Sequence, residues 1–234
     1  MTDLYFIQCN SVRYKKANRT KKNIKFIVVH YTGNNGDTAR NNLINASREG
    51  RQASAHFFVD EKEVCQSVLV EDIAWHCGTS GKYKHAECRN ANSIGVEMCS
   101  RMDKDGDYYF LPETVENTAK FVSDLMKEYG IPPACVVRHY DVTGKLCPRP
   151  YVDEIAWAEF KTLVLKYYTG KDVENEVEEV KRYKTVEDVP AWAKPYIKTL
   201  VEKGFIAGTD DGSLDLSYDM VRMLIITGRM NGVF

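Results

Sequence analysis

Residues 25–31, KFIVVHY, restrict the fold of this chain more than any other segment of the sequence. The consecutive apolar residues FIVV favour a buried β-strand, and the segment TGNNG at residues 32–36 ends that strand in a loop. His30 therefore stands at the carboxyl end of a buried strand. Such a strand belongs in a sheet that other elements cover.

Further strand and helix patterns alternate along the chain up to residue 168. The strand candidates are runs rich in apolar residues, and the first two flank a short polar turn as in a hairpin; they are residues 56–59, 64–70, 93–99 and 134–138. The helix candidates carry apolar residues at helical spacing or clear end signals; they are residues 37–49, with Asp37 as the cap, 112–129 and 155–168. We therefore expect an α/β domain over residues 1–168, in which helices flank a central sheet.

The composition changes after residue 168. Residues 171–184, KDVENEVEEVKRYK, are dense in charge, which predicts a charged linker over residues 169–184. Residues 185–234 follow as a small helical unit, with a helix at 191–203 and a final helix from Ser217. A unit of about fifty residues buries little surface alone, so we expect it to pack on the first domain or to dimerise.

Charge and hydropathy exclude several classes of partner. The formal net charge of −1 gives no sign of a polyanionic partner, so no nucleic acid is expected. The first thirty residues are polar and basic, and their apolar run is too short for a signal peptide or a membrane span. We therefore expect a chain that is made in the cytoplasm without a signal peptide and that has no membrane partner.

The seven cysteines are scattered singly, without a Cys-x-x-Cys pair. This pattern argues against a zinc knuckle and against a complete disulfide framework. Cys65, Cys99 and Cys135 fall within strand-like runs, where we expect them to act as small buried apolar residues.

His30, His139 and Cys147 together have the chemistry of a metal site. A neutral imidazole and a thiolate are natural zinc ligands, and catalytic zinc sites use three protein ligands so that a fourth position stays open. One ligand ends a strand over a hundred residues upstream, and the other two flank a single loop, HYDVTGKLC. This spacing suits a catalytic site better than a structural one. Ordinary roles for a strand-end histidine and a loop cysteine are the alternative that spacing alone leaves open.

Six short motifs occur in order along residues 20–167. They are VHYTG at 29–33, SAHF at 54–57, AWH at 74–76, NSIGVE at 92–97, RH at 138–139 and KLCP at 145–148. In this order they resemble the zinc-dependent N-acetylmuramoyl-L-alanine amidases, a group that includes phage lysozyme-type amidases, prophage endolysins and peptidoglycan recognition proteins. The resemblance implies the amidase type 2 fold, with a mixed central β-sheet flanked by helices.

The resemblance also implies a reaction and a set of roles. His30, His139 and Cys147 are the expected ligands of Zn²⁺, which lowers the pKa of a bound water and polarises the scissile carbonyl. The bond cleaved is the amide between N-acetylmuramic acid and the first L-alanine of the stem peptide. Glu97 is the expected proton acceptor and donor, and Lys145 the expected stabiliser of the oxyanion.

Three further residues match motif positions and are expected to contact substrate or to support the site, namely His76, Trp75 and His56. A buried core role is the alternative for each of them. One position departs from the pattern, because Ala55 stands where some phage members carry a catalytic tyrosine. Glu97 then has to supply that function.

Residues 185–234 weakly resemble a single S-layer-homology repeat. The resemblance is carried by the segment DVPAWAK at 188–194, by Gly204 and Gly208, and by Arg222. It implies attachment to the cell wall. Dimerisation through the apolar run at 220–226 is the alternative.

These observations predict a prophage-type endolysin that acts on peptidoglycan and muropeptides at the bacterial cell wall, after release through another factor such as a holin. The first rival is a recognition module without turnover, but such relatives typically lack the cysteine ligand, whereas Cys147, Glu97 and Lys145 are all present. The second rival is a structural zinc protein, which needs a fourth ligand from His56 or another cysteine.

Overall fold

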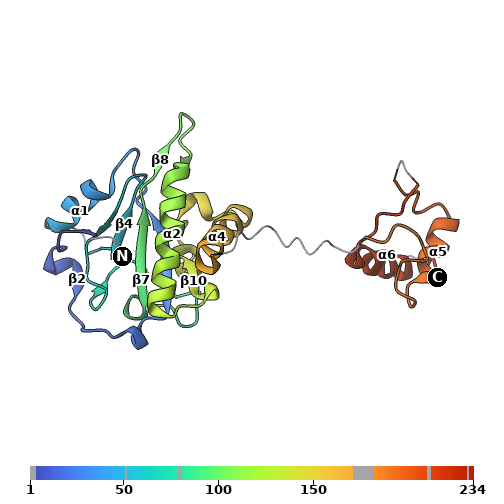
Figure 1. The fold of residues 1–234 in the computed structure, drawn as a ribbon, viewed down its shortest axis with the longest axis horizontal. Helices are drawn as coiled ribbons and strands as arrows, with labels where there is room; N and C mark the ends of the chain where they lie inside the picture. Colours follow the sequence, from blue (N-terminus) through green and yellow to red (C-terminus); the bar gives the residue numbers. More distant parts are fainter. Residues whose placement is uncertain (1–3, 51, 79–80, 171–181, 210–211, 231) are drawn as a thin grey trace. The chain divides into compact units, whose positions relative to one another are not determined.

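A computed structural model of the chain describes residues 4–50, 52–78, 81–170, 182–209, 212–230 and 232–234. The chain divides into two compact units, Met1–Val173 and Glu174–Phe234 (Figure 1). Most of the expected charged linker, residues 171–181, lies outside the described residues. Within the described part of the chain, no helix combines the length and the apolar character that crossing a membrane requires.

In the described part of the first unit, six strands form a mixed sheet. Their order is β1 (Tyr5–Phe6), β5 (Val64–Gln66), β4 (Phe57–Val59), β7 (Ser93–Met98), β3 (Phe26–Tyr31) and β10 (Val136–Arg138). All neighbouring strands are parallel except β4 and β5, which form the expected antiparallel hairpin. Two small antiparallel ladders join β2 (Tyr14–Lys15) to β6 (Ile73–Ala74), and β8 (Arg101–Met102) to β9 (Tyr108–Tyr109).

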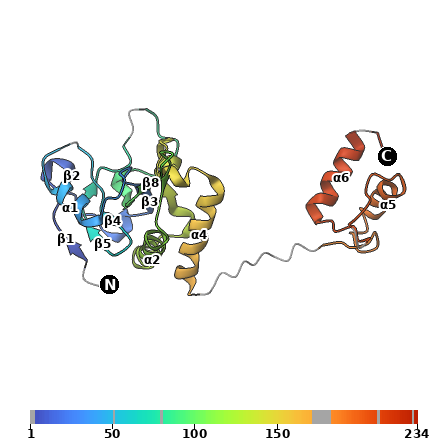
Figure 2. The same cartoon turned by 90° about the horizontal axis from the view of Figure 1, so that it is seen from above.

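The helices α2 (Pro112–Tyr129) and α4 (Glu154–Thr169) lie side by side and cover one face of the sheet (Figures 1 and 2). Proline at its first position and Gly130 in the left-handed conformation bound α2, as expected from the sequence. Ile27 and Val29 of β3 pack into the apolar core beneath these helices. Because side chains alternate across a strand, His30 points to the opposite face.

The helix α1 (Ala39–Ser47) covers part of that opposite face (Figure 2). It begins after Thr38, whose side chain accepts a hydrogen bond from the backbone N–H of Asn41. The expected cap, Asp37, accepts hydrogen bonds from the side chains of Thr32, Asn34 and Asn42 instead. The prediction of the cap was therefore wrong by one residue, because the Asp37 carboxylate is engaged by the loop that follows β3.

Short helical turns complete the first unit. The helix α3 (His139–Thr143) follows β10 directly. The 3₁₀ turns are Ser11–Arg13, Lys21–Asn23, Asn90–Asn92, Pro133–Cys135 and Arg149–Tyr151. The turn that begins at Pro133 explains why β10 starts at Val136 and not at residue 134.

The second unit packs α5 (Lys194–Glu202) and α6 (Tyr218–Met230) around its own small core. The helix expected from residue 191 begins at Lys194, because the backbone forms turns through residues 191–193. Val221 and Ile225 of α6 are buried, whereas Met223 and Ile226 are 61% and 47% exposed. Apolar residues therefore lie on both the inner and the outer face of α6.

Candidate metal centre

The three predicted metal ligands meet at the carboxyl ends of β3 and β10. These strands are parallel neighbours with Val29 opposite Arg138, so His30 and His139 leave the sheet side by side. Their ring centroids are 4.8 Å apart, and the Cys147 Sγ atom lies 3.6 Å from Nδ1 of His30. One ligand atom from each of the three residues lies within 4.8 Å of the others, and all three residues are buried.

The protonation chemistry of this cluster fits a metal ion. Burial, followed by the charge of Lys145, lowers the pKa of His139 to about 4, so its ring is neutral near pH 7. Neither ring nitrogen of His139 has a well-formed hydrogen bond among the described residues. Burial and then the Glu97 charge raise the pKa of the Cys147 thiol to about 12, so a nearby cation is needed to hold it as a thiolate. The cluster thus offers three side chains whose chemistry suits a metal ion.

Arg138 holds His139, the second predicted ligand, in place. This arginine directly precedes His139, is 4% exposed, and donates hydrogen bonds to Asp141 Oδ1 at 2.6 Å and to Glu154 Oε1 at 2.9 Å. It also donates to the backbone carbonyl of Tyr151 at 2.8 Å. These contacts tie the start of α3 to the segment beyond Cys147 and to α4, which fixes both ends of the ligand loop. The peptide bond that follows Cys147 is cis.

Glu97 lies beside the three ligands. In the sheet register it stands opposite His30 of β3 and Phe58 of β4, on the face of the sheet that His30 occupies. The residue is half-buried, but its Oε2 atom is shielded from solvent and has no hydrogen-bond partner among the described residues. Burial raises the pKa of this carboxyl to about 8, although the charge of Lys145 opposes that shift. A carboxyl group in this state is suited to exchanging protons near neutral pH.

One cavity of about 290 Å³ collects most of the predicted site residues. Its lining includes all three predicted ligands together with Glu97, Lys145, Trp75 and His76. Lys145 is exposed on the loop before Cys147, and Trp75 is half-buried. The roles of Lys145 and Trp75 toward a substrate stay predictions.

The two remaining predicted histidines lie deeper. His76 is 8% exposed; its Nδ1 lies 3.0 Å from Nε2 of His30, and its Nε2 lies 3.2 Å from the Ser93 hydroxyl. His56 is fully buried, and its Nδ1 accepts the backbone N–H of Gly95 at 2.9 Å. His56 is absent from the lining of the cavity, and its role toward a substrate stays a prediction.

Two residues of the β7 segment were not predicted to take part. The Ser93 hydroxyl forms a hydrogen bond with Nε2 of His76, and Gly95 lies directly under the His76 ring. A Cβ atom on Gly95 would come within 2.6 Å of Cγ of that ring, so only glycine lets the ring lie flat on the strand. The sequence signal was a glycine inside an otherwise apolar strand, which often marks such a close approach.

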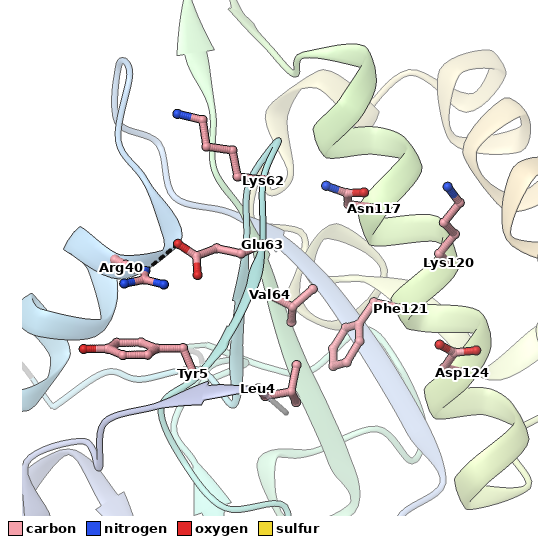
Figure 3. Close-up of a pocket in the computed structure, with 10 residues that line it drawn as sticks. All are labelled: Leu4, Tyr5, Arg40, Lys62, Glu63, Val64, Asn117, Lys120, Phe121 and Asp124. Carbon is pink, nitrogen blue, oxygen red and sulfur yellow. Dashed lines mark hydrogen bonds and ion pairs between the residues drawn. The ribbon is translucent and has the colours of Figure 1, made fainter. Parts of the chain in front are cut away.

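A second, larger hollow of about 630 Å³ lies at the edge of the sheet, where residues of α2, β1 and β5 line it together with Arg40 of α1 (Figure 3). Leu4, Val64 and Phe121 form its apolar floor, and Arg40 pairs with Glu63 at its rim (Figure 3). None of the ten residues that line it is a histidine or a cysteine. The chemically equipped cavity is therefore the smaller one.

Comparison with known proteins gives two matches to family models and several curated relatives. Residues 20–150 match the family model described as N-acetylmuramoyl-L-alanine amidase, and residues 182–215 match the S-layer homology domain. The chain is 38% identical over 157 residues to the N-acetylmuramoyl-L-alanine amidase CwlL of Bacillus licheniformis, which covers 64% of this chain and 42% of that protein. It is 34% identical over 174 residues to the N-acetylmuramoyl-L-alanine amidase BlyA of Bacillus subtilis, which covers 69% of this chain and 46% of BlyA.

Solved structures show the same fold. The structure of PlyL aligns with a TM-score of 0.57 at 26% identity, covering 70% of this chain and 97% of PlyL. The catalytic domain of XlyA aligns with a TM-score of 0.55 at 28% identity, covering 69% and 99%. These alignments confirm the predicted fold class, a mixed central sheet flanked by helices.

The chain spans less than half the length of the two curated relatives. The match to the family model nevertheless covers more than half of the chain and includes His30, Glu97, His139 and Cys147. The chain belongs to the N-acetylmuramoyl-L-alanine amidase family.

Proposed function

We propose that this chain is a zinc-dependent, endolysin-type amidase that hydrolyses the bond between N-acetylmuramic acid and L-alanine in peptidoglycan. The observation that carries this proposal is the meeting of His30, His139 and Cys147 with the Glu97 carboxyl in one cavity. Two neutral imidazoles and a thiol supply three of the four ligands that catalytic zinc takes. Among the described residues this group contains three members, which favours an open catalytic site over a closed structural one.

Several residues of the cavity have a part in the proposed reaction. Zinc, when bound, supplies a water of lowered pKa and a Lewis acid for the scissile carbonyl. Glu97 takes the proton from the attacking water and returns it to the departing amine of L-alanine. Lys145 brings a positive charge to the developing oxyanion. Trp75 gives the cavity a flat apolar wall that suits a sugar or peptide.

The test is product analysis of purified muropeptides incubated with the zinc-loaded protein. We expect mass spectrometry to show free stem peptides whose new amino terminus is L-alanine, together with the peptide-free sugar. A chelator should stop the release, and added zinc should restore it. Binding of muropeptides without cleavage would favour the recognition module, and cleavage at another bond would contradict the proposed specificity.

We further propose that the C-terminal unit attaches the chain to the bacterial cell wall, as the match of residues 182–215 to the S-layer homology domain suggests. The apolar outer face of α6, which includes Met223, favours a second copy of the chain as the alternative partner. We expect the full chain to pellet with purified cell walls and to be monomeric in analytical ultracentrifugation. The Met223→Glu variant should behave in the same way. The alternative would be supported if the parent chain is a dimer, if the Met223→Glu substitution makes it monomeric, and if the parent does not pellet with purified cell walls.

A further inference from the structure

We propose that His76 is a positioning residue, which fixes the tautomer of His30 so that Nδ1 of His30 is the atom presented to the metal. The proposal rests on the metal centre proposed above. Its basis is a chain of three hydrogen bonds that runs from the carbonyl of Arg89 through Ser93 and His76 to His30. The donor and the acceptor of each of these hydrogen bonds follow from the first acceptor, the Arg89 carbonyl.

The series of hydrogen bonds begins at the Arg89 carbonyl, which can only accept a hydrogen bond. The Ser93 hydroxyl lies 2.7 Å from that oxygen and has one proton, so this proton points to Arg89. Toward His76 the same hydroxyl must then act as an acceptor. His76 Nε2, at 3.2 Å, therefore carries the ring proton of His76.

A neutral imidazole carries one ring proton, so Nδ1 of His76 is left as an acceptor. It lies 3.0 Å from Nε2 of His30, which must be the donor of that bond. The remaining nitrogen of His30, Nδ1, then carries no proton and keeps its lone pair. This is the nitrogen that faces Cys147 Sγ at 3.6 Å. The tautomer set by His76 is thus the one that a metal between His30 and Cys147 requires.

The Arg89 carbonyl, the first acceptor of these three hydrogen bonds, is rigidly held. Arg89 caps the 3₁₀ turn Asn90–Asn92, and its backbone N–H donates to the Asn92 side chain at 2.7 Å. The backbone N–H of His76 is held in turn by Oδ1 of Asn90 at 3.1 Å. Gly95 supports the His76 ring from below, as described above. The His76 ring is therefore fixed in position as well as in tautomer.

This arrangement bears on the expected substrate contact of His76. Both of its ring nitrogens are already bonded within the protein, and the residue is 8% exposed. A substrate can touch the edge of the ring in the cavity, but it finds no free nitrogen there. His76 therefore acts on the reaction through His30.

Two substitutions of His76 separate hydrogen bonding from packing. In His76→Asn, the side-chain oxygen can take the place of Nδ1 and accept the His30 proton, although the side chain is smaller. In His76→Leu, the volume is closer to that of histidine but the acceptor is lost. We expect about 10- to 100-fold weaker zinc binding for the leucine variant and a loss of only a few-fold for the asparagine variant. Competition with a chromophoric chelator measures both. Ser123→Ala, at a buried serine of α2, is the control and should leave zinc affinity unchanged.

Nitrogen NMR of the histidine rings in the zinc-free protein reads the tautomers directly. Protons on Nε2 of both His30 and His76 would support the proposal, and a proton on Nδ1 of His76 would overturn it. If the parent protein binds no zinc, the metal centre itself is refuted. If the parent binds zinc and the leucine variant binds it equally well, only the positioning role fails. A raised KM for muropeptides with unchanged zinc affinity would restore His76 as a substrate contact.

Discussion

Replacement of Cys147 by serine should remove zinc from the protein and lower kcat/KM for muropeptide hydrolysis by about 10³-fold or more. A serine hydroxyl does not ionise near neutral pH, so the buried site keeps only His30 and His139 as effective ligands. Metal content after dialysis, measured by mass spectrometry, and the product assay described above test both expectations. Cys135→Ser is the matched control, because Cys135 lies in a 3₁₀ turn outside the cavity and should retain zinc and activity.

The same substitution should also remove the stabilisation that zinc gives to the fold. At a free zinc concentration of about a thousand times Kd, ligand binding raises the free energy of unfolding by about 4 kcal/mol. Thermal unfolding with and without zinc should show this gain for the parent and for Cys135→Ser, but not for Cys147→Ser. Full zinc content and an undiminished thermal shift in Cys147→Ser would refute the assignment of this cysteine as a ligand.

Glu97→Gln should separate metal binding from proton transfer. Glutamine has nearly the same shape but accepts no proton, so we expect kcat to fall by about 10²- to 10⁴-fold. Zinc content should stay at the parental level, and KM should change little, because Glu97 is not among the three ligands.

A matched control for this experiment is Glu63→Gln, at the rim of the larger hollow at the edge of the sheet. Its activity should match that of the parent. Activity of Glu97→Gln within tenfold of the parent would mean that another group moves the proton. Loss of zinc from this variant would mean that the carboxylate supports the metal instead.

The sequence predicted the parts of this site that depend on strand order and chain direction. An apolar strand that ends in His30, and a second strand that ends just before His139, bring both histidines to one edge when the strands are parallel neighbours. The long helix α2 was also predicted at its observed bounds, because its apolar spacing and its glycine stop are local signals. The family resemblance supplied Glu97 and Lys145, which no local pattern distinguishes from surface residues.

The chain of hydrogen bonds behind His30 was beyond sequence reasoning. Ser93 and His76 lie 17 residues apart, and their contact depends on which way each side chain leaves its segment. The cap of α1 was missed for a similar reason, because the choice between Asp37 and Thr38 is decided by tertiary hydrogen bonds to Asp37.

The register between β3 and β7 has a consequence for how this family tolerates sequence change. His30 and Glu97 are directly opposed residues on parallel neighbours, so backbone hydrogen bonds hold their main chains at the inter-strand spacing of about 4.8 Å. The gap between the proposed metal ligand and the proposed proton-transfer residue is then set by the peptide backbone, which is the same for every sequence. Surrounding side chains can drift widely while this gap stays constant, whereas a single-residue insertion in either strand would carry one of the two groups to the wrong face.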